Sequence, residues 1–261
     1  MKISEKFEEL RNKDEAALIA YVCAGDPDPG TTEEIVNTLV RSGADIVELG
    51  LPFSDPTADG PTIQAAAERA LSAGMNTDRY FELVASIEVP IPLVCMTYYN
   101  LIFKRGIDRF VTDCTRSGIT GIIVPDLPAE ESEMLAKSCR EHDVDLIFMI
   151  TPVTNDERIS KILEKSSGFV YVVSRLGVTG KRSDISDTTA DILSRVTTEL
   201  PKAVGFGISN GEQAAKVVEA GADGVIVGSA LVDIIASGND VTDRIASLTA
   251  DLKNGCSSSP Q

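Results

Sequence analysis

Short apolar runs alternate with longer amphipathic segments along almost the whole chain, and this alternation constrains the fold most. Each run is apolar nearly throughout, which is typical of parallel strands covered on both faces. The predicted strands are 16–25, 45–50, 91–99, 121–126, 145–150, 169–174, 202–209 and the first part of 224–235. The helices that follow them are predicted at 31–43, 61–74, 106–118, 128–142, 156–167, 188–200, 211–221 and 240–253. Eight strand-then-helix units in 261 residues predict an α/β fold, the TIM (β/α)8 barrel.

Two further helices are expected at the ends of this pattern. The segment "EKFEELRNK" at 5–13 predicts an extra N-terminal helix that covers the barrel floor, and a short helix is expected after strand eight. Residues 1–253 are predicted to form a single domain, and 254–261 a disordered tail. A doubly wound open sheet is the alternative, but it favours fewer strands and a GxGxxG motif after the first strand, which is absent here.

Composition excludes several classes of function. The net charge is −16, which disfavours binding to nucleic acid and to anionic membranes. No apolar run of about 18 residues predicts a transmembrane helix, and the N-terminal segment lacks the features of a signal peptide, so a cytoplasmic protein is expected. The five cysteines are scattered without a CxxC pair, which predicts reduced, buried thiols. The single histidine, His142, is predicted on the surface, so neither a Ser-His-Asp triad nor a metal site is expected.

One predicted strand, "DIVELG" at 45–50, carries a charge in an apolar run. Val47 and Leu49 share one face and suit the helix layer, so Glu48 is predicted to point into the barrel near its mouth. Partial desolvation there would raise the pKa of Glu48 and let it exchange protons near neutral pH. A buried glutamate paired with a Lys or Arg is the alternative, but no basic residue lies nearby in the sequence.

A second carboxylate, Asp59, lies in the loop "PFSDPTADGPT". Three prolines stiffen this loop and Gly60 permits a sharp turn. A stiff loop favours a side chain aimed over the barrel mouth, because catalysis requires fixed orientation. The alternative is that Asp55 and Asp59 cap turns, or that Asp59 caps the helix that begins near Pro61.

Two glycine-bearing segments end the last two strands, "GFGIS" at 205–209 and "VGSA" at 227–230. In such barrels the loops after strands seven and eight usually form a phosphate site with the N-terminus of a short helix. Backbone N–H groups could bind an anionic substrate there although the chain is acidic. The candidate donors are Gly207, Ile208, Gly228 and Ser229. Simple tight turns would explain the same glycines.

The long polar segment "SRLGVTGKRSDIS" at 174–186 predicts a lid that orders over the substrate. Thr179 and Gly180 are its candidate hydrogen-bond donors, and a disordered connection is the alternative. A pocket for a flat apolar group could be lined by aromatic side chains, each of which would also suit the core. These are Tyr21, Tyr98, Tyr171 and Phe206.

These segments resemble, in the same order, those of the tryptophan synthase alpha subunit family. "VELGLPFSDPTADGPTIQ" is similar almost position for position to the family's signature, and this long motif is highly specific. The resemblance covers the chain from residue 1 to about 253. Further similar segments are "AGDP" at 24–27, "MTYYN" at 96–100, "PDLPAEE" at 125–131, "SRLGVTG" at 174–180 and the two glycine segments, which alone would also fit other phosphate-binding barrels.

The resemblance implies cleavage of indole-3-glycerol phosphate to indole and glyceraldehyde 3-phosphate, without a cofactor. It also implies a heterotetramer with a pyridoxal-phosphate beta subunit, which would meet the strand-top face and receive indole through a tunnel. The implied catalytic residues are Glu48 and Asp59. The implied substrate-binding residues are Thr179, Gly180, Phe206, Gly207, Gly228 and Ser229, with Tyr21 and Tyr98 in the indole pocket. Tyr21 departs from the Phe of many family members.

Two other functions also fit the residues. One is a different phosphosugar isomerase or aldolase on the same barrel. A Schiff-base aldolase needs an inward lysine on a strand, whereas Lys202 lies at the start of its strand, the wrong end. The other is a binding subunit that regulates a partner. An assay of the isolated chain for indole formation, with and without a beta subunit, separates these functions.

Overall fold

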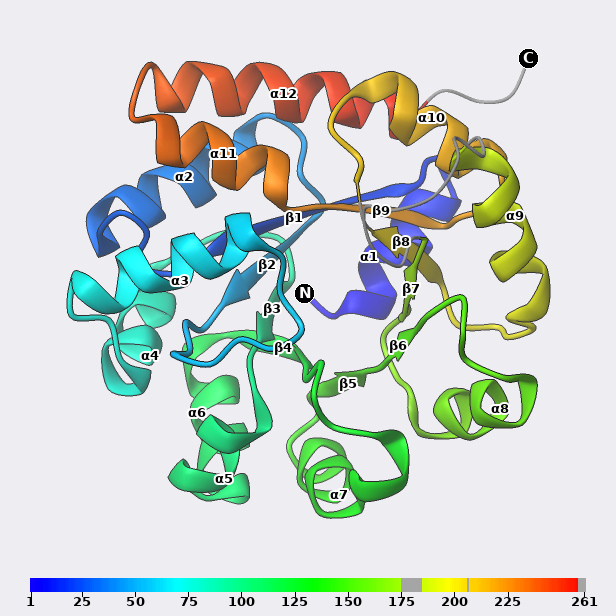
Figure 1. The fold of residues 1–261 in the computed structure, drawn as a ribbon, viewed down its shortest axis with the longest axis horizontal. Helices are drawn as coiled ribbons and strands as arrows, with labels where there is room; N and C mark the ends of the chain where they lie inside the picture. The colour runs from blue at the N-terminus through cyan, green and yellow to red at the C-terminus, as the bar shows by residue number, and fades with distance from the viewer. Residues whose placement is uncertain (175–184, 206, 258–261) are drawn as a thin grey trace.

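Parallel strands close into a barrel with helices around it (Figure 1). The computed structural model describes residues 1–174, 185–205 and 207–257, and within these it has nine strands in the order β5-β4-β3-β2-β1-β9-β8-β7-β6. The strands are β1 (Ala17–Cys23), β2 (Ile46–Gly50), β3 (Leu93–Met96), β4 (Ile119–Ile123), β5 (Asp145–Ile147), β6 (Met149–Ile150), β7 (Val170–Val173), β8 (Lys202–Gly205) and β9 (Gly224–Val227). They occupy the eight predicted strand positions, so the TIM barrel is confirmed.

The predicted strand 145–150 is divided into two short strands, and this division closes the ring. β5 pairs with β4, whereas β6 pairs with β7 through Met149 and Tyr171. Phe148 lies between the two, and its carbonyl accepts a hydrogen bond from the Tyr171 N–H at 3.0 Å. Residues 145–150 therefore pair with β4 on one side and with β7 on the other, and this pairing closes the barrel.

The helices surround the barrel or cover its end (Figure 1). They are α1 (Ile3–Arg11), α2 (Pro29–Arg41), α3 (Pro61–Ser72), α4 (Thr77–Ser86), α5 (Tyr99–Arg105), α6 (Ile107–Ser117), η1 (Ala129–Glu131), α7 (Glu133–Glu141), α8 (Asp156–Lys165), α9 (Ile185–Arg195), α10 (Gly211–Glu219), α11 (Ser229–Ser237) and α12 (Val241–Cys256). α11 is the short helix expected after strand eight, whereas α4 and α5 are additional. Strand β3 ends at Met96, so the predicted strand 91–99 is too long.

The C-terminal helix α12 is longer than predicted. It continues to Cys256, which is buried, so residues 254–256 of the expected tail are helical. All five cysteines of the chain are buried and free, as predicted. No helix in the described part of the chain is long and apolar enough to cross a membrane.

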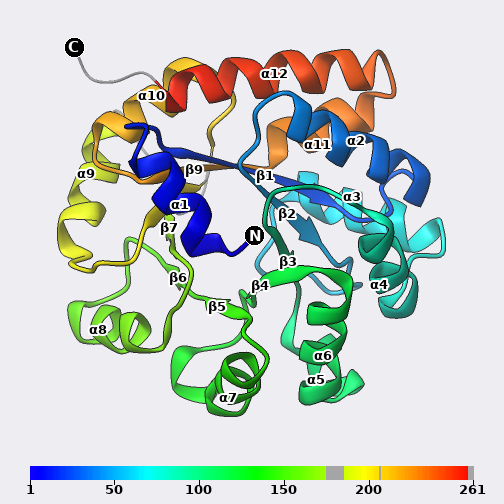
Figure 2. The same ribbon diagram turned by 180° about the vertical axis from the view of Figure 1, so that it is seen from behind.

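Helix α1 covers the floor of the barrel, as predicted, and Figure 2 shows it lying across that end. Ile3 and Phe7 are buried within the apolar cluster that fills the barrel interior, and the rings of Phe7 and Phe169 lie 5.9 Å apart. Gly121 permits this close approach, because a Cβ atom at that position would lie 2.7 Å from the Ile3 side chain. A second, larger cluster fills the layer between the strands and the surrounding helices.

Candidate functional site

A cavity of about 370 Å³ lies at the carboxyl ends of the strands. Most of the predicted site residues in the described part of the chain line it. These are Tyr21, Glu48, Asp59, Tyr171, Gly207, Ile208, Gly228 and Ser229. Apolar side chains from β3, β4, β6 and β9 form the floor of the cavity above the interior cluster, namely Met96, Ile123, Met149 and Ile226. The strand tops therefore bring residues from distant parts of the sequence into one cavity.

Glu48 lies in the middle of β2, where it pairs with Tyr21 on β1, and its side chain is on the cavity wall. Only 1% of it is exposed, and Oε2 has no hydrogen-bond partner among the described residues. Burial, with a smaller contribution from the charge of Asp59, raises the pKa of Glu48 to about 8. Such a carboxyl group is mostly protonated at pH 7 and can give up its proton to a substrate.

Asp59 lies on the loop between β2 and α3, above the same cavity. Burial raises the pKa of Asp59 to about 6, although a hydrogen bond with the Tyr98 side chain acts in the opposite direction. Gly60, rather than Asp59, occupies the N-cap position of α3. The helix-cap alternative is therefore wrong, and the Asp59 carboxylate is available to a ligand.

Tyr98 supports this loop and is not among the residues that line the cavity. Its hydroxyl accepts a hydrogen bond from the Ala58 N–H at 3.0 Å, and its ring lies 5.3 Å from that of Phe53. Tyr98 is also buried at the end of β3. The structure thus places it behind Asp59, whereas the expectation from the sequence was a place in the aromatic pocket.

Gln64 on α3 is a supporting residue that the sequence analysis does not identify. Its side-chain amide donates to the Asp59 carbonyl at 2.8 Å and to the Pro56 carbonyl at 3.5 Å. The only sequence signal is its position five residues after Asp59, one turn into the helix. Asp55, by contrast, is exposed and accepts a hydrogen bond from the Ser54 hydroxyl at 2.6 Å, outside the cavity lining.

Two tyrosines line the cavity in equivalent arrangements. Tyr21 extends over Gly50 of β2, and Tyr171 extends over Gly205 of β8, so a Cβ atom at either glycine would collide with the tyrosine hydroxyl. In both cases the glycine lies two residues beyond the position that pairs with the tyrosine on the neighbouring strand. These glycines leave the space that each tyrosine hydroxyl occupies, which any larger side chain would fill.

Residues that follow β8 and β9 line the cavity with their backbone, namely Gly207, Ile208, Gly228 and Ser229. Gly228 is the N-cap of α11, and its carbonyl accepts from the N–H groups of Leu231 and Val232. The N–H of Ser229 belongs to the first turn, where no intrahelical acceptor exists, so the helix dipole favours an anion there. Gly207, with φ 77°, lines the same side. Thr179, Gly180 and Phe206 lie outside the described residues.

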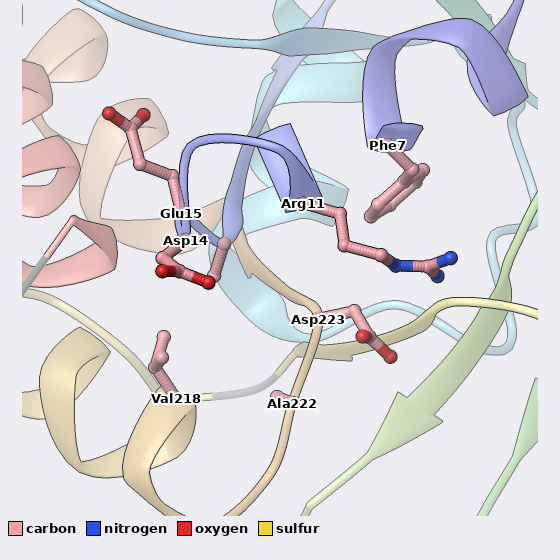
Figure 3. Close-up of a pocket in the computed structure, with 8 residues that line it drawn as sticks. Phe7, Arg11, Asp14, Glu15, Val218, Ala222 and Asp223 are labelled. Atoms are coloured by element: carbon pink, nitrogen blue, oxygen red, sulfur yellow. The ribbon is translucent and has the colours of Figure 1, made fainter. Parts of the chain in front are cut away.

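A pocket of about 330 Å³ lies at the opposite end of the barrel, beside α1 and α10 (Figure 3). Two of its three acidic side chains have partners: Glu15 pairs with Lys253 at 2.8 Å, and Asp223 accepts from the Lys202 N–H at 2.9 Å. We therefore assign these two acidic residues to the stability of the barrel floor. The residues that the structure describes contain no group of His, Cys, Asp and Glu side chains suited to a metal ion.

Comparisons with known proteins agree with this arrangement. A family model described as tryptophan synthase alpha chain matches residues 7–257. The tryptophan synthase alpha chain of Methanosarcina barkeri is 61% identical over 254 residues, which cover 97% of each chain. A tryptophan synthase structure from Mycobacterium tuberculosis has a TM-score of 0.91 at 37% identity and covers 98% of each chain. A tryptophan synthase complex from Pyrococcus furiosus has a TM-score of 0.85 at 37% identity, covering 92% of this chain and 98% of that one.

Proposed function

This chain belongs to the tryptophan synthase alpha chain family, and on that premise we propose that Glu48 and Asp59 catalyse its reaction. The reaction is the cleavage of indole-3-glycerol phosphate to indole and glyceraldehyde 3-phosphate. The single observation that carries the proposal is the cavity itself. It combines a carboxyl group with a strongly raised pKa, a second carboxylate, and free N–H groups at the N-terminus of a helix.

The chemistry of this cleavage sets the requirements for the site. A proton must be delivered to C3 of the indole ring, which becomes tetrahedral and leaves positive charge on the ring nitrogen. A base must remove the proton of the hydroxyl group on the adjoining glycerol carbon. The electron pair of the C–C bond then returns to the ring, so that indole leaves and the aldehyde of glyceraldehyde 3-phosphate forms.

Glu48 is suited to both proton transfers. With a pKa of about 8, its carboxyl group can protonate C3, and the resulting carboxylate can then take the hydroxyl proton, which restores the acid. Asp59, with a pKa of about 6, is mostly ionised at pH 7. It accepts the hydrogen bond of the ring N–H and stabilises the positive charge that develops there.

We infer the orientation of the substrate from the strand order. The phosphate is bound by the N–H groups of Gly207, Gly228 and Ser229, after β8 and β9. In the closed ring these strands lie opposite β3 and β4. The aromatic ring therefore extends toward the apolar side chains of Met96 and Ile123, with Glu48 on the adjoining strand and Asp59 above.

The partner is a tryptophan synthase beta subunit, within a heterotetramer. Three exposed large apolar side chains support the strand-top face as the contact surface. Phe103 lies on α5, after β3, and Val153 follows β6, while Met134 lies in the first turn of α7, which faces the same end because barrel helices run antiparallel to the strands. Exposed apolar side chains of this size are typical of interaction sites. We place the enzyme in the cytoplasm, which the free thiols support.

The test is indole formation by the isolated chain and by the chain mixed with a beta subunit. Glu48→Gln keeps the size of the side chain but removes proton transfer, and a loss of roughly 10²–10⁴-fold in kcat is expected. Asp59→Asn should lose on the order of 10²-fold, because the charge opposite the ring nitrogen disappears. Asp55→Asn is the matched control, a carboxylate of the same loop outside the cavity, and the isolated chain should keep its rate. Normal indole release by Glu48→Gln would rule out the proposed mechanism.

A further inference from the structure

The floor of the cavity contains two side chains whose shape is not fixed by branching. Met96 on β3 and Met149 on β6 are only partly buried, and both pack against the interior cluster beneath them. Their neighbours Ile123 and Ile226 are 1% and 4% exposed. Because isoleucine branches at Cβ, its side chain is restricted to few rotamers, whereas methionine has three rotatable bonds and adapts to irregular spaces.

The backbone beneath both methionines is held by the sheet. The Met96 carbonyl accepts a hydrogen bond from the Leu51 N–H at 2.9 Å, and Met149 pairs with Tyr171 in the β6–β7 ladder. A change in the shape of the floor is therefore confined to the ends of the two side chains. Glu48 lies on β2, outside this pair, so the reacting carboxyl group does not have to move with them.

Both methionines lie on the side of the cavity that receives the aromatic ring. The phosphate donors follow β8 and β9, and the opposite arc of the ring is formed by β3 and β4, with β6 next to it. A substrate held by its phosphate thus places its indole ring over Met96, Ile123 and Met149. A substituent on the benzene part of that ring would contact the floor of the cavity. Met96 and Met149 would move first, because their side chains can adopt more rotamers than isoleucine.

We propose that Met96 and Met149 set the size limit of the aromatic subsite and let it accept indole-3-glycerol phosphates that carry a substituent on the benzene ring. The inference rests on the proposed function, since it requires the indole ring to lie over this floor. An unbranched methionine can turn aside to admit an additional methyl group. A floor that is β-branched at all positions would exclude the same group by steric overlap.

The experiment compares kcat/KM for indole-3-glycerol phosphate with kcat/KM for four analogues, each with one methyl group at a different benzo carbon. Wild type should turn over at least one analogue within about tenfold of the parent substrate, and in Met96→Ile/Met149→Ile that ratio should fall by about tenfold or more, the range typical of one methylene in an apolar pocket. Equal ratios in wild type and variant at all four positions would overturn the inference. So would rejection of every analogue by wild type by more than about 100-fold.

Two further variants keep the test decisive. Met96→Leu/Met149→Leu conserves side-chain volume, so it is expected to fold even if the isoleucine variant does not, and its ratio should lie between those of wild type and the isoleucine variant. Met75→Leu is the matched control, because Met75 is buried against Gly25 outside the cavity, and it should keep the wild-type ratio. Absence of indole from the parent substrate contradicts the proposed function, whereas normal turnover of the parent with unchanged ratios contradicts only this inference.

Discussion

The Tyr98 hydroxyl accepts a hydrogen bond from the Ala58 N–H at 3.0 Å, across 40 residues of sequence, and thereby fixes the loop that carries Asp59 to the end of β3. The same hydroxyl bonds to the Asp59 carboxylate and lowers its pKa, against the larger effect of burial. On the other side, Gln64 donates to the Asp59 carbonyl. Both the position and the acidity of Asp59 therefore depend on a side chain that does not line the cavity.

Replacing Tyr98 by Phe removes this hydroxyl and little else. The pKa of Asp59 should rise, because the hydrogen bond that stabilises its ionised form is lost, so the acidic limb of kcat/KM against pH should move to higher pH. A hydrogen bond to a charged group contributes about 1.5–3 kcal/mol, so a loss of roughly tenfold or more in rate is expected. Tyr99→Phe, at the neighbouring position, is the control. An unchanged acidic limb in Tyr98→Phe would contradict this role.

The pKa values of the two carboxyl groups predict a bell-shaped pH profile for the isolated chain. The active form has Glu48 protonated and Asp59 ionised, so kcat/KM should fall below about pH 6, where Asp59 takes up a proton, and above about pH 8, where Glu48 loses one. The two limbs report the titration of the pair as a whole. Steady-state rates from about pH 5 to about pH 9 measure it. A rate that stays constant through the alkaline range would show that protonated Glu48 is not required.

The burial of Glu48 also predicts that Glu48→Gln is more stable than wild type. The pKa of Glu48 is about 8 in the folded chain against an ordinary value of 4.5. Between these two pH values the folded chain keeps a proton that the unfolded chain releases, so the free energy of unfolding falls as pH rises from 4.5 to about 8. Glutamine stays neutral, and its advantage should grow over this range to several kcal/mol, since one pKa unit corresponds to about 1.4 kcal/mol.

Urea unfolding at a series of pH values measures this gain in the free energy of unfolding. Glu82→Gln is a suitable control, because Glu82 is exposed on α4 and its replacement changes the surface and not the cavity. A gain for Glu48→Gln that is independent of pH would exclude ionisation as the cause.

The ion pair between Asp26 and Arg69 is predicted to hold α3 in place. Asp26 is 1% exposed, and Arg69 donates to both of its carboxylate oxygens, at 2.8 and 2.7 Å. Arg69→Met leaves a buried carboxylate unpaired and should cost about 3–5 kcal/mol of stability. It should also lower kcat, because α3 begins directly after the loop of Asp59.

A double-mutant cycle with Asp26→Asn tests the pairing directly. Asp26→Asn/Arg69→Met contains neither charge, so it should recover most of the stability that Arg69→Met loses. Unfolding free energies that simply add between the two single variants would show that the pair is not coupled.

The barrel could be predicted because its strands are covered on both faces and therefore stand out as apolar runs between amphipathic segments. The errors arise where local signals conflict with tertiary structure. Tyr98 and Tyr99 favour a strand by propensity, yet α5 begins at Tyr99, so the predicted strand is too long. The division of 145–150 into β5 and β6 depends on which neighbour each half pairs with, and no local pattern records this.

For the site, the inward direction of Glu48 follows from the two-residue period of a strand, and the structure places its side chain on the cavity wall. The supporting roles of Tyr98 and Gln64 could not be predicted, since they depend on contacts to the backbone of a folded loop. The catalytic and binding roles of the site residues remain predictions, and Thr179, Gly180 and Phe206 also lie outside the described residues.

Helix α1 closes the amino-terminal end of the barrel. Ile3 and Phe7 fill the barrel interior beneath the cavity, so among the described residues the cavity is bounded on that side and lies toward the carboxyl ends of the strands. Substrate would enter and both products would leave at this end of the barrel. A protein bound at this end of the barrel would therefore affect both the entry of substrate and the release of indole.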